Sequence, residues 1–157
     1  MPLPVGTLMP SLDDATEWLN STCTVDSLQG RPSLVQFWAI SCPACKANLP
    51  RLQRLVHDYA AEGLQLISVH RPRMESDLDV SKVQAIMDEL GITGPCAIDN
   101  THAIGDLFQT ASVWPCYFLF DANGKLRSRA AGQLGLKIAE NSLKRTLGVE
   151  ERESVAA

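Results

Sequence analysis

Two cysteines separated by two residues, Cys42 and Cys45, closely follow an apolar segment at residues 34–39. The segment predicts a buried strand, and the cysteines then open a predicted helix. At a helix N-terminus, unpaired backbone N–H groups and the positive end of the helix dipole stabilise a thiolate. Neighbours at i and i+3 on a helix lie about 5–6 Å apart, which suits a disulfide because its Cα atoms must lie about 4.4–6.8 Å apart. The pattern therefore predicts a redox-active dithiol in which Cys42 attacks a disulfide and Cys45 resolves the mixed disulfide.

The same spacing also occurs in one half of a zinc site and in pairs of ordinary buried thiols. A zinc site needs two more ligands, usually from a second close-spaced pair, whereas Cys23, Cys96 and Cys116 are scattered singly. Redox chemistry is therefore the favoured interpretation, and no metal site is expected. Cys116 is expected to be a small buried residue, with a regulatory or off-pathway disulfide as the alternative.

Length and charge narrow the class of protein. The chain has 157 residues, of which 45% are hydrophobic, and this is enough to bury a sizeable core without metal or structural disulfides. We expect one domain over residues 1–157, with 149–157 as a flexible tail. The net charge is −4, and the chain has no long basic run. We therefore expect neither nucleic acid nor a membrane as a partner, and we expect a monomer.

The first residues bear on where the chemistry takes place. They carry no basic segment followed by a sustained apolar segment, and Asp13, Asp14 and Glu17 interrupt the stretch that follows. This pattern indicates a protein without a signal peptide, which would act in the cytoplasm. Because the cytosol is reducing, the five cysteines of the chain are expected to be thiols at rest. A transient catalytic disulfide fits this compartment.

Apolar periodicity and turn residues predict alternating strands and helices along the chain. The helix at 81–90 ends at Gly91, and the turn Asp121-Ala122-Asn123-Gly124 predicts a hairpin. Because right-handed crossovers connect the first βα units, their strands are expected to be parallel and the later strands antiparallel. The predicted strands are 34–39, 64–69, 96–99, 116–120 and 125–130, and the predicted helices are 42–61, 81–90, 104–108 and 136–147.

Four features around the cysteines carry a family resemblance. Phe37-Trp38-Ala39 stands before the pair, Lys46 follows it directly, Pro50 lies further along the same helix, and Pro115 precedes an apolar strand with Asp-x-x-Gly. This combination resembles the thioredoxin superfamily, within it the TlpA/ResA branch of thiol–disulfide oxidoreductases, and most of all a leaderless cytosolic type. The resemblance implies an α/β thioredoxin-like fold: a central mixed sheet flanked by helices, with an N-terminal extension and a central βα insertion.

The resemblance also implies supporting roles around the dithiol. Trp38 matches the family's tryptophan behind the active site, with core packing as the alternative role. Pro115 matches the cis proline that packs beside the disulfide, and Trp114 would offer backbone groups to the substrate chain. Pro43 and Ala44, between the cysteines, would tune how well the helix stabilises the thiolate.

The chain departs from the family pattern beside the nucleophile and at the buried acid. Ser41 replaces the aromatic residue that many relatives have before the first cysteine, and we expect this to open that side of Cys42 to solvent. The stretch Leu34-Val35-Gln36 lacks the aspartate of thioredoxins, so no buried acid is aligned for proton transfer. His70 and Glu75 are the remaining candidates for proton transfer, with a surface histidine as the alternative for His70.

These observations predict a cytoplasmic thiol–disulfide oxidoreductase that reduces protein or small-molecule disulfides and uses no cofactor beyond the Cys42–Cys45 disulfide. Electrons would come from another reductant, such as a thioredoxin-reductase-like partner. A thiol peroxidase of the peroxiredoxin type is one alternative, although Ala39 stands where that class has Thr or Ser. A copper- or zinc-binding protein of the same fold is the other.

Overall fold

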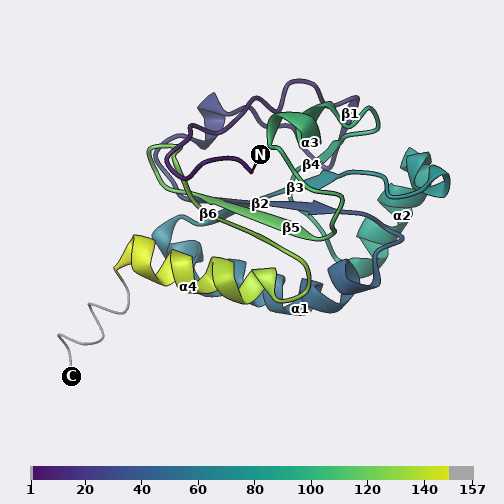
Figure 1. Ribbon diagram of the computed structural model, residues 1–157. Coiled ribbons are helices and arrows are strands. Elements are labelled where there is room, and N and C mark those ends of the chain that lie inside the picture. Colours follow the sequence, from purple (N-terminus) through teal and green to yellow (C-terminus); the bar gives the residue numbers. More distant parts are fainter. Residues whose placement is uncertain (1, 149–157) are drawn as a thin grey trace.

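Six strands form one mixed sheet in the computed structural model, which describes residues 2–148 (Figure 1). The strand order across the sheet is β1-β4-β3-β2-β5-β6. β2, β3 and β4 are parallel, whereas β1, β5 and β6 pair antiparallel with their neighbours. The strands are β1 (Glu17–Leu19), β2 (Ser33–Trp38), β3 (Gln65–His70), β4 (Cys96–Ile98), β5 (Cys116–Phe120) and β6 (Leu126–Ala131). The tail predicted at 149–157 lies outside the described residues.

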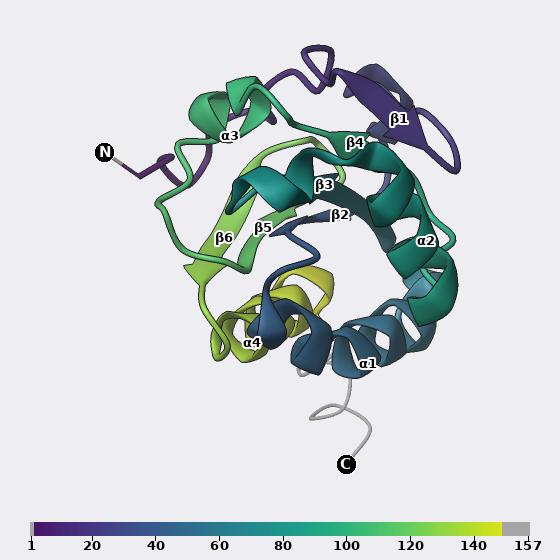
Figure 2. The same ribbon diagram turned by 90° about the vertical axis from the view of Figure 1, so that its right-hand side faces the viewer.

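Helices cover both faces of the sheet (Figure 2). Three of them, α1, α2 and α4, pack on one face, and α3 packs on the other together with the N-terminal segment. Because β2, β3 and β4 follow one another in one direction across the sheet, right-handed crossovers place α1 and α2 on the same face. The helices are α1 (Pro43–Asp58), α2 (Val80–Leu90), α3 (Ala103–Leu107) and α4 (Gly135–Leu147), with 3₁₀ turns at Asp26–Leu28, Ala60–Glu62 and Glu75–Leu78.

The predicted fold class is confirmed, and each predicted strand and helix is present, most with ends displaced by one residue. The helix predicted over 42–61 is shorter, since α1 ends at Asp58 and the chain turns through Ala60–Glu62 to Gly63, whose φ is 86°. The βα unit predicted as an insertion corresponds to α2 and β4. The short edge strand β1 was not predicted, because it is three residues long and pairs with β4 alone.

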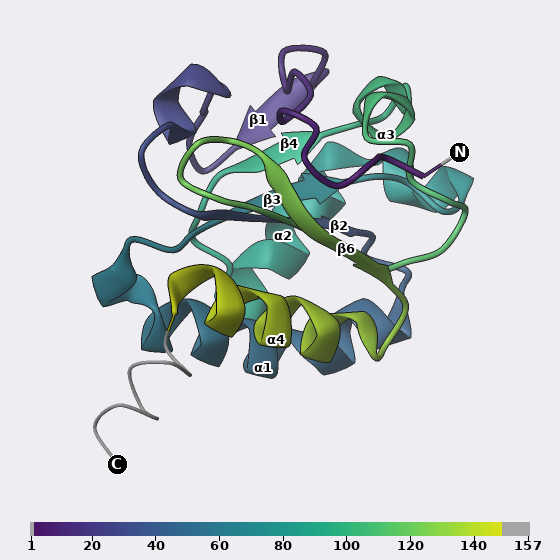
Figure 3. The same ribbon diagram turned by 60° about the vertical axis from the view of Figure 1, so that its left-hand side comes forward.

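The predicted N-terminal extension lies along the hairpin between β5 and β6 (Figure 3). Leu8 forms an isolated antiparallel bridge with Lys125, and the N–H of Gly6 donates to the carbonyl of Leu126 at 2.7 Å. Leu12, further along, is fully buried in the core on the α3 face. The extension is therefore part of the packed fold.

Alternation along β2 sends successive side chains to opposite faces of the sheet. Leu34 and Trp38 join the core beneath α1, α2 and α4, while Val35 and Phe37 join the core on the α3 face. In open α/β sheets, functional sites lie outside the carboxyl ends of the parallel strands. Because β2 ends at Trp38, the chain delivers the start of α1 to this edge.

The helix that carries the dithiol is amphipathic. Leu49, Leu52 and Leu55 recur at helical spacing and are buried, while Pro50 stands inside α1 with its ring exposed. At 16 residues, α1 is the longest helix in the described part of the chain. Within residues 2–148, no helix combines the length and hydrophobicity needed to cross a lipid bilayer.

Phe108, directly after α3, is the centre of an aromatic cluster. Its fully buried ring makes edge-to-face contacts with Phe37, Phe118 and Phe120 at centroid separations of 5.2, 5.3 and 6.0 Å. Because Phe108→Ala leaves a cavity among these rings, we expect the free energy of unfolding to fall by about 3–5 kcal/mol. Urea unfolding followed by circular dichroism measures the change.

Leu107→Ala is the matched control for this prediction. Leu107 directly precedes Phe108, and its side chain is 43% exposed. Truncation of this side chain should therefore change the free energy of unfolding by about 0.5 kcal/mol or less. If Phe108→Ala lowers the free energy of unfolding by less than about 1 kcal/mol, the packing described is contradicted, because truncation of a fully buried aromatic side chain to alanine costs several times more.

Candidate active site

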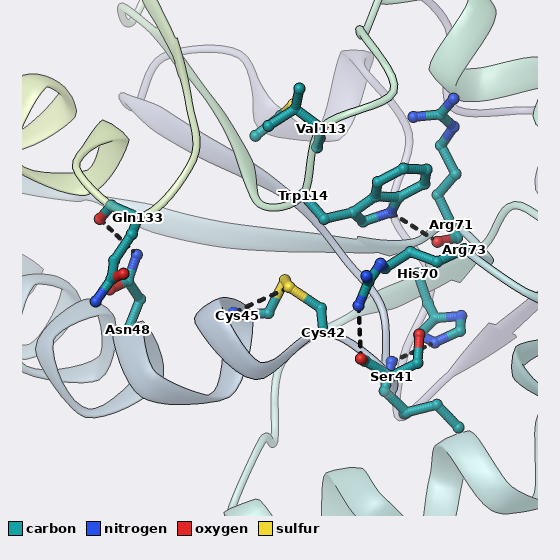
Figure 4. Close-up of a disulfide and its surroundings, with 12 residues drawn as sticks. Ser41, Cys42, Cys45, Asn48, His70, Arg71, Arg73, Val113, Trp114 and Gln133 are labelled. Carbon is teal, nitrogen blue, oxygen red and sulfur yellow. Dashed lines mark hydrogen bonds between the residues drawn. A yellow bond between two sulfur atoms is a disulfide. The ribbon is translucent and has the colours of Figure 1, made fainter.

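Cys42 and Cys45 form a disulfide at the start of α1, as the sequence predicts (Figure 4). Their Cα atoms lie 5.3 Å apart. Cys42 is the N-cap residue of α1, and its sulfur accepts a hydrogen bond from the backbone N–H of Cys45 at 3.1 Å. A free helix N–H directed at a sulfur favours its thiolate form once the disulfide is reduced.

An open groove of about 500 Å³ lies beside one of the two cysteines. Cys42 lines this groove, whereas Cys45 is not among the described residues that line it. An incoming disulfide in the groove would therefore meet Cys42 first. The lining residues are Cys42, Pro43, Ala44, Arg73, Met74, Ser112, Val113 and Trp114.

Ser41 does not open the nucleophile to solvent, so that expectation is wrong: Cys42 is only 3% exposed. The Ser41 hydroxyl donates to Oδ2 of Asp77 at 2.6 Å. Figure 4 shows the second contact of this residue, in which the Arg73 guanidinium donates to the Ser41 carbonyl at 2.6 Å. The segment after β3 thus lies against the residue before Cys42. A small polar residue here binds a neighbouring segment instead of leaving a gap.

The peptide bond between Trp114 and Pro115 is cis, as the family resemblance implied. The indole Nε1 of Trp114 donates to the carbonyl of Arg71 at 2.9 Å, and the Arg71 guanidinium lies 4.6 Å from the centre of the indole (Figure 4). Arg71 also donates through Nη1 to the carbonyl of Ala111 at 3.1 Å. These contacts hold the loop before β5 against the end of β3.

His70 is fully buried as the last residue of β3, so the alternative of a surface histidine is wrong. Its ring makes an edge-to-face contact with the buried indole of Trp38, with the ring centroids 5.0 Å apart. Nε2 accepts from the backbone N–H of Ile40 at 3.1 Å, which places the proton of the neutral ring on Nδ1. Burial lowers the pKa of His70 to about 4, against the opposing effect of Asp77, so the imidazole is neutral at pH 7.

Asp77 is the buried carboxylate near the dithiol, and the sequence analysis did not select it. Oδ2 accepts from the Ser41 hydroxyl and from the backbone N–H groups of Arg73 and Met74. Burial raises the pKa of this carboxyl, but these hydrogen bonds outweigh the effect and leave the pKa below its ordinary value. Asp77 is therefore an anion at pH 7. Glu75 lies on the same 3₁₀ turn and is exposed.

Neither predicted proton carrier, His70 nor Glu75, is among the described residues that line the groove. Gln36, in the stretch that lacks the thioredoxin aspartate, is 3% exposed and donates through Nε2 to the Ser68 hydroxyl at 2.9 Å. Its amide has no titratable proton. The one signal that pointed to Asp77 was the polar residue at Ser41, which needs a hydrogen-bond partner when packed.

The other cysteines, Cys23, Cys96 and Cys116, are free thiols, and Cys96 shares the core of the dithiol. Cys116 belongs to the core on the α3 face, across the sheet from Cys42, and its thiol donates to the carbonyl of Val113 at 3.0 Å. Burial raises the pKa of Cys116 to about 11 and that of Cys96 to about 12, so both stay protonated at pH 7. Across residues 2–148, no group of three or more His, Cys, Asp or Glu is arranged to hold a metal ion.

Known proteins resemble this chain in sequence and fold. The solution structure of a thioredoxin-like protein in the oxidized form matches with a TM-score of 0.82 and 36% identity, covering 93% of this chain and 98% of that one. The chain is 38% identical over 144 residues to thiol-disulfide oxidoreductase YkuV of Bacillus subtilis (strain 168), covering 91% of this chain and 96% of that protein. It is also 28% identical over 123 residues to thiol-disulfide oxidoreductase ResA of Oceanobacillus iheyensis, covering 78% of this chain and 61% of that protein.

The thioredoxin-like sheet, the disulfide at the start of α1 and these relatives define the protein as a thiol–disulfide oxidoreductase. The profile of the AhpC/TSA family matches residues 5–129, and the chain therefore belongs to that family. The predicted resemblance to ResA-like oxidoreductases and the predicted enzyme class are confirmed.

The buried, neutral state of His70 makes stability depend on pH. Its pKa of about 4 in the folded protein lies below the ordinary 6.5, so the unfolded chain binds the proton first as the pH falls. Between pH 7 and 4.5 this group should remove about 2 kcal/mol from the free energy of unfolding. His70→Gln keeps an acceptor for the Ile40 N–H but does not titrate. Between the two pH values, the free energy of unfolding of the variant should therefore fall by about 2 kcal/mol less than that of the wild type. Urea unfolding at both pH values tests this, and equal losses would contradict the neutral state of His70.

Asp77 places a negative charge beside the residue that precedes Cys42, which disfavours the Cys42 thiolate. Asp77→Asn should therefore favour the reduced dithiol, by about fivefold in the equilibrium constant with glutathione. Glu75→Gln removes the same charge from an exposed side chain and should leave that constant within about 1.5-fold. The reduced fraction in glutathione buffers, read by alkylation and mass spectrometry, measures both. A shift of Asp77→Asn toward the disulfide would contradict the electrostatic effect.

Proposed function

We propose that this oxidoreductase reduces disulfides, chiefly in other proteins, through a mixed disulfide on Cys42. The observation that carries the proposal is the position of Cys42, which lines the groove and whose sulfur accepts the first-turn N–H of Cys45. Cys45 lies further along the first turn of the helix and is not among the described residues that line the groove. The two thiols therefore have different tasks.

The proposed exchange has two steps. The Cys42 thiolate attacks one substrate sulfur, forms the mixed disulfide and releases the other substrate sulfur as a thiolate. Cys45 then attacks the Cys42 sulfur, which breaks the mixed disulfide, forms the Cys42–Cys45 bond and releases the second thiolate. The substrate gains two electrons and the enzyme dithiol loses them. The Cys45 thiol and solvent in the open groove supply the protons.

Several neighbours of the dithiol would support this exchange. Trp114 and Pro115 would hold the substrate chain opposite Cys42, since Trp114 lines the groove and the bond between them is cis. Pro43 and Ala44 also line the groove, and they would set how well the first turn of α1 stabilises the thiolate. The buried Trp38 would pack behind the pair, within the same core as both cysteines.

The direction and setting of the reaction are part of the proposal. We place it in the cytoplasm, where a glutathione poise of about −220 mV or lower favours a resting dithiol and hence disulfide reduction. Electrons would come from another reductant, such as a thioredoxin-reductase-like partner. The enzyme would act as a monomer with the Cys42–Cys45 disulfide as its redox group, without a membrane or nucleic-acid partner.

Trapping of the mixed disulfide tests the proposal. Cys45→Ser removes the resolving thiol, so substrate proteins should remain linked to Cys42 and should appear as dithiothreitol-sensitive bands on non-reducing gels. Cys42→Ser is the matched control and should trap no more than background. The wild type should also accelerate insulin reduction by dithiothreitol, and both serine variants should lose that acceleration. Equal trapping by the two variants would contradict the separate tasks of the cysteines.

The two alternative functions supply further controls. Ala39 stands three residues before Cys42 and accepts its N–H through the carbonyl at 3.0 Å, with no side-chain hydroxyl to offer a peroxide. The reduced enzyme should therefore consume hydrogen peroxide much more slowly than it reduces insulin. Faster peroxide consumption, or stoichiometric copper or zinc in enzyme purified under reducing conditions, would contradict the proposal.

A further inference from the structure

Arg73 gives the groove beside Cys42 a positive charge. Among the described residues that line the groove, Arg73 and Cys42 are the ones with titratable side chains. The whole chain carries a net charge of −4, so the charge at the groove is opposite to that of the protein. A local charge of this kind acts on whatever approaches the Cys42 sulfur.

The Arg73 guanidinium is held in place without a carboxylate partner. Its Nη1 donates to the carbonyl of Ser41, the residue before Cys42, at 2.6 Å (Figure 4). None of the ion pairs found in residues 2–148 involves Arg73. Asp77 accepts from the backbone N–H of Arg73 and not from its side chain. Because a guanidinium carries five N–H donors, most remain for an external carboxylate.

The remaining walls of the groove are mainly apolar. Met74 is 50% exposed and Val113 is 42% exposed, which places two large apolar side chains in solvent at this site. Trp114 adds an indole, and Pro43 and Ala44 complete the apolar lining. Exposed apolar side chains gathered around a groove are typical of a surface that receives a partner.

We infer that the preferred substrate is a peptide disulfide whose cysteine has an acidic residue on one side and an apolar residue on the other, with Arg73 as the specificity-determining residue. The inference rests on the proposed function, since Arg73 would act on the disulfide that Cys42 attacks. The Arg73 guanidinium receives the carboxylate, while Met74 and Val113 contact the apolar side chain. Charge complementarity favours an acidic peptide over a basic one because a lysine at the same place would face an unpaired cation.

A set of matched peptide disulfides tests the inference. Each peptide carries leucine on one side of its cysteine and aspartate, asparagine or lysine on the other, and the released thiol is measured with reduced, desalted enzyme at low salt. At the scale of an exposed ion pair, the aspartate peptide should react about threefold faster than the asparagine peptide, and the lysine peptide should react slowest. The preference should shrink at 0.5 M KCl because salt screens the charges.

Variants of Arg73 assign the preference to this side chain. Arg73→Ala should bring the ratio of aspartate to asparagine rates close to one, Arg73→Glu should make the lysine peptide the faster, and Arg73→Lys should retain part of the preference. Arg54→Ala is the matched control, since it removes an exposed arginine further along α1 and should leave both the rates and their ratio unchanged. Glutathione disulfide, which has carboxylates but no apolar side chain, should react more slowly than the aspartate peptide.

The outcomes separate this inference from the proposed function. Reduction of all three peptides at equal rates by the wild type would overturn the inference and leave disulfide reduction intact. The inference is equally overturned by an aspartate preference that survives in Arg73→Ala, or by glutathione disulfide reacting fastest. If the wild type reduces none of the peptides and does not reduce insulin, the proposed function itself is wrong.

Discussion

The hydrogen bond from the Cys45 N–H to the Cys42 sulfur is the contact on which the site depends. It exists because the buried strand β2 ends at Trp38 and the chain turns directly into α1, with Cys42 as the N-cap residue. A helix must offer its first N–H groups to some acceptor, and here the acceptor is a sulfur. The hydrogen bond that satisfies the N–H of Cys45 at the start of α1 also favours the thiolate form of Cys42.

Two loops frame that sulfur, and one side chain connects them. Arg71 follows β3, stacks its guanidinium on Trp114 and accepts the indole N–H of Trp114 through its carbonyl. Its Nε also donates to Nδ1 of His102, at the start of α3. The loop with the cis proline and the segment with Arg73 therefore share one support, which connects the two walls of the groove.

Much of the fold could be predicted from local pattern, because strands buried on both faces and capped amphipathic helices leave clear signals in the sequence. The surroundings of Cys42 could not be predicted in this way. The partner of Ser41 is Asp77, 36 residues further along the chain, and only the packed structure brings them together. The arginines that follow His70 suggest a surface position for this residue. The register of β3 instead places His70 beside Trp38 and Ile98 in the sheet. The charge of Arg71 is directed at the Trp114 ring.

The central claim is that Cys42 is the reactive thiolate and Cys45 is the resolving thiol. Brief labelling of the fully reduced protein with iodoacetamide at pH 7, followed by peptide mass spectrometry, measures this most directly. The account predicts that Cys42 is alkylated at least about ten times faster than Cys45, since the first-turn N–H favours the Cys42 thiolate and alkylation follows the thiolate fraction. Equal rates, or faster modification of Cys45, would contradict it.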